Sequence, residues 1–112
     1  LTDQTERMLV AEVVREQVLL QTEQEIPYAV AVTIDKFEDK GRVAVVAATI
    51  HVERPTQKAI LVGSKGQRIK AIGIAARREL EEMLDRKLYL ELFVRVHEGW
   101  SGKLAFLREI GL

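Results

Sequence analysis

The chain has 112 residues, of which 47% are hydrophobic and 30% are charged, and its 17 basic residues balance its 17 acidic residues. This composition is ordinary for a soluble globular domain, and a net charge of zero argues against a protein that coats nucleic acid indiscriminately. The lack of cysteine excludes a disulfide framework and thiolate chemistry. No apolar run reaches the length of a membrane span and no signal peptide is recognisable, so we expect one cytoplasmic domain over residues 1–112.

The first half of the sequence predicts a helix followed by a β-hairpin. Apolar residues at helical spacing predict an amphipathic helix from residue 2 or 3 to about residue 21. Its apolar side is expected to hold Leu9, Val10, Val13, Val14, Val18 and Leu20. Pro27 stops the helix, and alternation from Tyr28 predicts a strand. Gly41 lies in the turn that follows, and a second strand, antiparallel to the first, is predicted over about residues 42–53.

The second half predicts two helices, a strand and a final helix. A short helix is expected over residues 56–62 and a long one from Gly66 to about Asp85. The core stripe of the long helix is expected to hold Ile69, Ile72, Ala76, Leu80, Met83 and Leu84. Strict alternation predicts a strand over residues 87–96, and a last helix is expected over about residues 101–110.

This order of elements predicts an α+β fold. The helical crossover between the second and third strands favours parallel pairing with a right-handed connection. The economical arrangement is a three-stranded mixed sheet covered on one face by helices, with the other face more polar and partly solvated.

The sequence Gly63-Ser64-Lys65-Gly66 is the feature with the clearest functional meaning. Two glycines three apart allow a sharp turn and a close approach of ligand to backbone. The helix that follows presents free N–H groups and a partial positive charge at its start. This arrangement is suited to a phosphate, although the spacing matches neither a P-loop nor a dinucleotide-binding motif. The remaining mechanism is a G-x-x-G clamp that grips the backbone of single-stranded nucleic acid.

The basic residues gather around this turn. Residues 54–78 contain seven basic residues and no acidic one, whereas the rest of the chain holds 10 basic and 17 acidic residues. The seven are Arg54, Lys58, Lys65, Arg68, Lys70, Arg77 and Arg78. Because the segregation coincides with the glycine turn, we interpret it as a local anion site and not merely a solvated helix surface.

Catalysis and metal binding have little support in the sequence. His51 and His97 are predicted to lie far apart on strands without an acidic or cysteine partner. No spacing typical of metal ligands is present, and helical geometry separates the acidic residues of 79–85 around the helix surface. The aromatic residues Tyr28, Phe93 and Trp100 are each predicted to pack and not to stack on bases.

The glycine turn and its flanks resemble the KH family in its type II version. More specifically, the chain resembles the C-terminal KH domain of the Era family of bacterial ribosome-assembly GTPases. The matching pieces are residues 25–28, 52–54 with 57–58, 62–70, 72–73, 89–92 with Val94 and Val96, Trp100, and 107–111. The motifs of a GTPase domain are absent from these residues, and Ser64-Lys65 departs from the turn of many relatives.

This resemblance implies binding of single-stranded RNA at the 3′ end of small-subunit ribosomal RNA during small-subunit assembly. The implied RNA-binding residues are Lys58, Ile60, Gly63, Ser64, Lys65, Gly66, Gln67, Arg68, Ile69, Lys70 and Arg77. Ile60, Ile69 and Ile72 have the chemistry of a groove floor between the helices and the sheet edge. No enzyme activity or cofactor is expected in this chain, whereas the full-length relative uses GTP and magnesium.

The implied partners are the small ribosomal subunit, an N-terminal GTPase domain if the chain is a fragment, and a membrane that the full-length relative contacts peripherally. Two alternatives stay open from the sequence. One is a KH-fold module that docks on a ribosomal protein or a partner GTPase domain. The other is an RNA-binding domain from another type II KH protein, such as a ribosomal or transcription-elongation protein.

Overall fold

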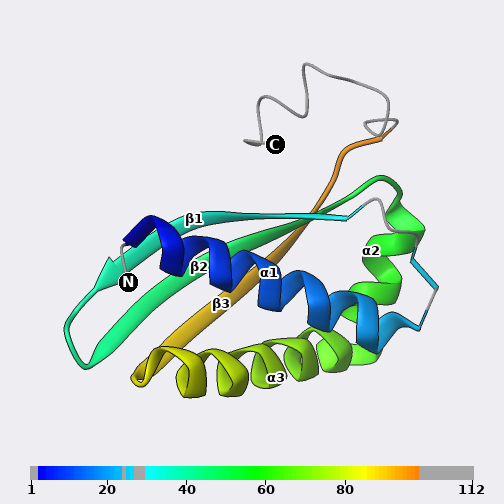
Figure 1. The fold of residues 1–112 in the computed structure, drawn as a ribbon. Helices are drawn as coiled ribbons and strands as arrows, with labels where there is room; N and C mark the ends of the chain where they lie inside the picture. Colours follow the sequence, from blue (N-terminus) through cyan, green and yellow to red (C-terminus); the bar gives the residue numbers. More distant parts are fainter. Residues whose placement is uncertain (1–2, 24, 27–29, 99–112) are drawn as a thin grey trace.

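The structure, a computed structural model, describes residues 3–23, 25–26 and 30–98. The elements in chain order are α1 (Asp3–Thr22), β1 (Ala31–Asp39), β2 (Val43–Val52), α2 (Pro55–Val62), a 3-10 turn η1 (Ser64–Gly66), α3 (Gln67–Leu84) and β3 (Lys87–Val96), as Figure 1 shows. The predicted element order is confirmed through β3, whose two ends agree with the prediction. The expected final helix and Trp100 lie outside the described residues, as does Tyr28.

The three strands form one mixed sheet in the order β1-β2-β3. β1 pairs antiparallel with β2, and β2 pairs parallel with β3. The connection between the parallel strands runs through α2, η1 and α3, and α1 and α3 lie side by side across one face of the sheet (Figure 1). This arrangement confirms the predicted type II KH architecture for the elements that the structure describes.

The core lies between the sheet and these two helices. α1 contributes Val10, Val14 and Val18, and α3 contributes Ile72 and Leu80; each of these side chains is fully buried. Removing such aliphatic side chains from water stabilises the fold by roughly 1.5–3 kcal/mol each. The predicted apolar stripes of both helices are therefore confirmed in their central turns.

Two residues of the predicted stripes are exposed to solvent. Leu20 is 60% exposed and Met83 is 49% exposed. Both lie in the last turn of their helix. Helical spacing fixes the direction in which a side chain points but not whether another element lies there, so the prediction was wrong at these two helix ends.

The other face of the sheet is open to solvent among the described residues. On β3, Tyr89 is 63% exposed and Phe93 is 49% exposed, and they alternate with the core-facing residues of the strand. The prediction of a more polar and solvated face is confirmed. The expectation that Phe93 packs was wrong, because its position on the strand directs it away from the helices.

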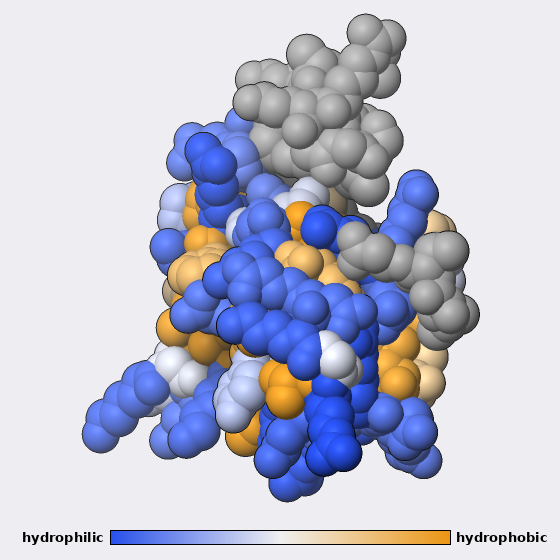
Figure 2. Space-filling view, turned by 90° about the vertical axis from the view of Figure 1, so that its left-hand side faces the viewer, coloured by the Kyte–Doolittle hydropathy of each residue, from blue (hydrophilic) through white to orange (hydrophobic). Residues whose placement is uncertain are grey.

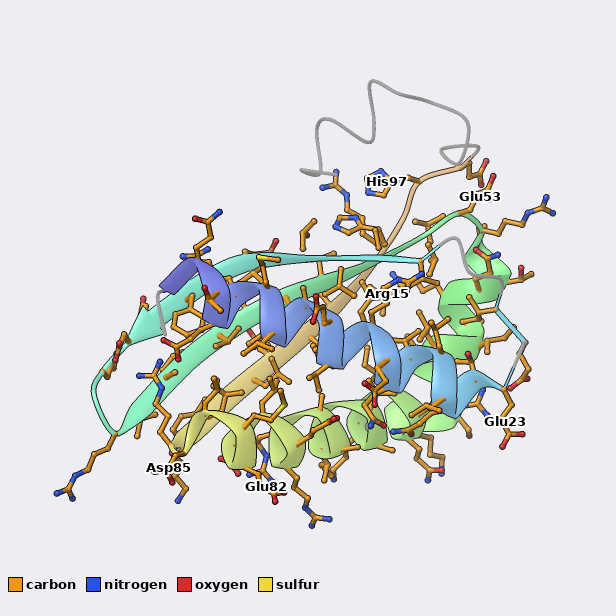
Figure 3. The ribbon with its side chains drawn as sticks, in the orientation of Figure 1. Arg15, Glu23, Glu53, Glu82, Asp85 and His97 are labelled. Atoms are coloured by element: carbon orange, nitrogen blue, oxygen red, sulfur yellow. The ribbon has the colours of Figure 1, made fainter. Side chains whose placement is uncertain are left out.

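The two histidines meet on this open face, so the prediction that they lie apart was wrong. His51 Nδ1 and His97 Nε2 are 3.1 Å apart, and Thr33 Oγ1 is 2.7 Å from His51 Nε2. Parallel pairing places His51 opposite Arg95, and His97 follows two residues later on the same side. Figure 3 shows His97 on the side of the sheet opposite α1. Sequence separation alone could not show this cross-strand contact.

Candidate nucleic-acid interface

The turn between α2 and α3 is held in a conformation that its sequence permits. Gly63 has φ 74° and ψ 178°, a region open essentially to glycine alone. Gly66 has φ 74° and ψ 15°, in the left-handed region, and begins α3 as its N-cap. Lys65 between them also has positive φ, at 55°. The amide of Gly66 donates to the carbonyl of Gly63 at 3.2 Å, which closes the turn.

The two glycines face different surroundings. A Cβ on Gly63 would lie 2.8 Å from Arg68 Cβ and 3.0 Å from Arg68 N, closer than side-chain carbons approach in real proteins. A Cβ on Gly66 would meet nothing within 4 Å. Gly63 therefore allows the backbone of the turn to pass directly over the first turn of α3, whereas Gly66 supplies only its backbone conformation.

The turn presents groups that attract an anion. Ser64 and Lys65 are exposed. The N-terminus of α3 has no side-chain cap and no acidic residue in its first turn. Helix N-termini carry unsatisfied N–H groups and a partial positive charge, which favours phosphate. The N-terminal end of α3, beside the glycines, is therefore suited to bind a phosphate group.

The start of α2, which leads into this turn, is fixed by Gln57. Its Oε1 accepts hydrogen bonds from the amides of Glu53 and Arg54, both at 2.9 Å, and the side chain is buried. These bonds satisfy donors at the start of the helix. α2 is thereby held to the end of β2, and it delivers Gly63 at a defined position.

The cations around the turn fall into two groups. Among the described residues, Lys58, Lys65 and Lys70 are exposed and form no ion pair. Arg68 binds Glu25, with Nη1 and Oε1 2.9 Å apart, and Arg77 binds Glu81 at 3.1 Å. The five cations predicted to bind RNA thus lie on α2, the turn or α3, but only the three lysines form no ion pair among the described residues.

A groove lies beside the turn, between α3 and the edge strand β3. Its volume is about 340 Å³. The lining is Ile69, Lys70, Gly73, Ile74, Arg77, Leu90, Glu91 and Leu92. Aliphatic side chains form most of its wall, with charged groups at the rim. Its volume and its mostly aliphatic lining are those of a small-ligand site.

The three isoleucines predicted for the groove floor lie in different surroundings. Ile69 lines the groove and Ile60 is partly buried, but Ile72 is fully buried in the core and is not accessible to a ligand. Sequence reasoning missed Ile74, Leu90 and Gly73. Gly73 offered a signal, because a glycine inside a helix costs stability; a Cβ there would lie at ordinary contact distance, 3.7 Å, from Leu92 Cδ1.

Other site chemistries find no support in the described part of the chain. Within it, no group of three or more acidic, histidine or cysteine residues is placed to hold a metal ion. Figure 3 shows Glu82 and Asp85 on the side of α3 away from the sheet, while Glu81 is engaged by Arg77 and by the amide of Leu88. None of the helices in these residues is both long and apolar enough to cross a membrane.

Known proteins share this sequence and this fold. Residues 25–101 match the KH domain family. GTPase Era of Geotalea uraniireducens is 49% identical over 112 residues, and the match covers 99% of this chain but 38% of that protein. GTPase Era of Geobacter metallireducens is 49% identical over 113 residues with the same coverage. The chain thus spans little more than a third of the length of these relatives.

A solved structure of Era gives the same result in three dimensions. It holds Era in complex with MgGDPNP and nucleotides 1506–1542 of 16S ribosomal RNA. The TM-score is 0.85 at 41% sequence identity, and the match covers 94% of this chain and 36% of that one. With a matching sequence over residues 25–101, the mixed three-stranded sheet and the glycine turn beside its groove, the chain belongs to the KH-domain family.

Proposed function

We propose that this chain binds single-stranded RNA through the Gly63–Gly66 turn and the groove between α3 and β3. The observation that carries the proposal is the geometry of the turn: exposed Ser64 and Lys65 stand at the uncapped N-terminus of α3, directly beside an aliphatic groove. A backbone phosphate would bind at the turn, with Lys65 and Lys70 as counter-charges. The bases that follow would enter the groove against Ile69 and Leu90, since phosphate contacts position a strand while base contacts read it.

The chemistry at the groove favours single strands. Its walls are aliphatic and its rim carries a few charged groups, so unpaired bases can be buried there, whereas a duplex would keep its bases stacked inside. β3 is an edge strand, and its outer edge can offer main-chain donors and acceptors to base edges. A KH clamp takes about four nucleotides.

We further propose that the RNA is the 3′ end of small-subunit ribosomal RNA and that binding serves small-subunit assembly in the cytoplasm. The support is the Era complex with nucleotides 1506–1542 of 16S ribosomal RNA. In this proposal the domain 1–112 is a non-enzymatic binding domain, and guanine nucleotide with magnesium belongs to the part of the relatives that this chain does not match. An N-terminal GTPase domain, the ribosomal subunit and a membrane surface are the corresponding partners.

The test introduces negative charge at the clamp. The double variant Ser64→Asp/Lys65→Asp should fold normally, because both side chains are exposed, and should lose at least tenfold in affinity for an RNA of nucleotides 1506–1542. The matched control is Lys40→Asp/Arg42→Ser in the β-hairpin turn, which changes the net charge equally at the other end of the sheet. Equal affinity of the clamp variant and wild type would refute the proposal.

A second candidate function, docking on another protein, is favoured by the open face of the sheet. Tyr89 and Phe93 are large, exposed and on the same face of β3, with Glu91 between them. Salt separates the two functions, because RNA binding weakens with salt through counterion release and an apolar contact does not. Replacing Tyr89 and Phe93 with Ser should leave RNA affinity unchanged and should weaken only a protein contact.

A further inference from the structure

Arg68 stands next to the glycine turn, but one nitrogen of its guanidinium, Nη1, is already engaged. Nη1 donates to Glu25 Oε1 at 2.9 Å and lies 3.4 Å from the carbonyl oxygen of Ile60 in α2. Its Cβ and backbone nitrogen form the surface over which Gly63 passes. One side chain therefore contacts α2, the turn, and the connection between α1 and β1.

The far end of this contact is itself fixed. The amide of Glu25 donates to the carbonyl of Thr22, the last residue of α1, at 2.8 Å. Ile26, the next residue, is 3% exposed and belongs to the core. Glu25 is thus anchored on both sides, and it offers Arg68 a carboxylate at a defined place.

This arrangement opposes a direct role for Arg68 in phosphate binding. A phosphate that reached the guanidinium would have to displace the carboxylate of Glu25 or lie beside it. In the second case the two negative charges would repel each other. Lys65 and Lys70 carry no such neighbour among the described residues and are exposed. A phosphate is accommodated better by these lysines and by the start of α3.

We propose that Arg68 is a positioning residue for RNA binding: its contacts with Glu25 and Ile60 hold the glycine turn in the geometry that grips the RNA, and Arg68 itself does not contact phosphate. This inference rests on the function proposed above. Glu25, although an acid beside an RNA site, is then required for full affinity.

The first test uses the sign of the effect. Glu25→Gln removes a negative charge near the RNA, so electrostatics alone would raise affinity, whereas loss of positioning lowers it. We expect about a two- to fivefold loss for Glu25→Gln, the range of a partly exposed ion pair. The matched control is Glu23→Gln, an exposed acid near the end of α1 (Figure 3) that forms no ion pair among the described residues; its affinity should stay level or rise.

The second test uses salt. Removing one phosphate-binding cation from a single-strand site reduces the slope of log K against log salt by about 0.7. We expect Arg68→Gln to lower affinity at every salt concentration without changing this slope, and Lys65→Gln to reduce the slope. Arg68→Lys, which keeps a cation within reach of Glu25, should recover part of the affinity. The double variant Glu25→Gln/Arg68→Gln should lose no more than Arg68→Gln alone.

The outcomes separate this inference from the proposed function. If the wild type binds the 1506–1542 RNA and Ser64→Asp/Lys65→Asp abolishes binding, the proposed RNA binding at the glycine turn is supported. A rise in affinity for Glu25→Gln, or a smaller salt slope for Arg68→Gln, would then overturn the positioning role alone. If wild type does not bind this RNA, the proposed function fails and the positioning role fails with it.

Discussion

Gly63 and Gly66 have the same φ, yet substitution should affect them unequally. Ala at Gly63 would combine a glycine-only backbone conformation with a Cβ 2.8 Å from Arg68 Cβ. We expect Gly63→Ala to destabilise the domain by about 3 kcal/mol or more. Gly66→Ala meets open space, so only the left-handed backbone opposes it, at about 1–2 kcal/mol, and Gly66→Asn should cost less. Urea unfolding of the three variants measures the difference in the free energy of unfolding. Equal losses for Gly63→Ala and Gly66→Ala would show that Arg68 moves aside without loss of stability.

His51 should make stability depend on pH. Burial lowers the pKa of its imidazole below the ordinary value, and neighbouring His97 lowers it further; Asp35 opposes the shift and Arg95 adds to it. The charged form is therefore disfavoured in the folded state, and the unfolded chain takes up the proton first. Stability should be unaffected above about pH 6.5 and should fall as the pH drops below it, down to the lowered folded pKa.

The measurement is urea unfolding between pH 7.5 and about 5.5, a window above the titration of most carboxylates. His51→Gln should remove a large part of the pH dependence of the free energy of unfolding. Gln can still bond Thr33, which lies 2.7 Å from His51 Nε2, so the variant should fold. If the variant's free energy of unfolding depends on pH as the wild type's does, other groups cause the pH dependence.

At the scale of elements, Arg86, in the connection between α3 and β3, joins α1, β1 and the hairpin turn. Nη2 binds Glu6 of α1 at 2.6 Å, and Nη1 binds Asp39 of β1 at 2.7 Å and the Gly41 carbonyl oxygen at 3.2 Å. The side chains of Arg86 and Glu6 are each 12% exposed. Removing the cation leaves the mostly buried carboxylate of Glu6 without its partner, so we expect Arg86→Ala to cost about 2–4 kcal/mol.

A matched control shows whether burial decides this cost. Lys36 pairs with Glu38 on the same hairpin at 3.3 Å, but the two side chains are 50% and 46% exposed. Lys36→Ala should cost less than about 1 kcal/mol. Thermal unfolding of the two variants gives the comparison, and similar losses would mean that Arg86 acts through solvent-exposed charge and not through burial.

The elements themselves were largely predictable, because each depends on local periodicity. β3 alternates without interruption and its bounds were predicted at both ends, whereas the predicted stripe of α3 includes Met83, which is 49% exposed in the last turn of the helix. Contacts across the fold were not predictable in the same way. The Arg68–Glu25 pair joins residues 43 apart and the His51–His97 pair joins residues 46 apart. Only the register of the sheet and the packing of α3 bring such residues together.

At the scale of the whole molecule, the two ends of the sheet differ in charge, because residues 54–78, which include the glycine turn, contain no acid, whereas the hairpin segment 36–42 carries both signs. Figure 1 shows the glycine turn, between α2 and α3, at the end of the sheet opposite the β-hairpin turn. Figure 2 views the hairpin end, where hydrophilic residues cover most of the surface and apolar ones appear as separate spots. With a net charge of zero, the described residues therefore present a localised cationic site and no extended basic surface.

This separation predicts a modest salt dependence for RNA binding. If Lys58, Lys65 and Lys70 each neutralise one phosphate, the slope of log K against log salt should be about −2. A slope near −3.5 would instead mean that Arg68 and Arg77 also give up their carboxylates to bind phosphate. Fluorescence anisotropy with a labelled 1506–1542 RNA over 50–300 mM salt measures it. Lys40→Gln in the hairpin turn should leave the slope unchanged, because at 0.1 M salt charges are screened beyond about 10 Å. A change in affinity or slope for Lys40→Gln would therefore show that the cationic site is not local, whichever lysines form it.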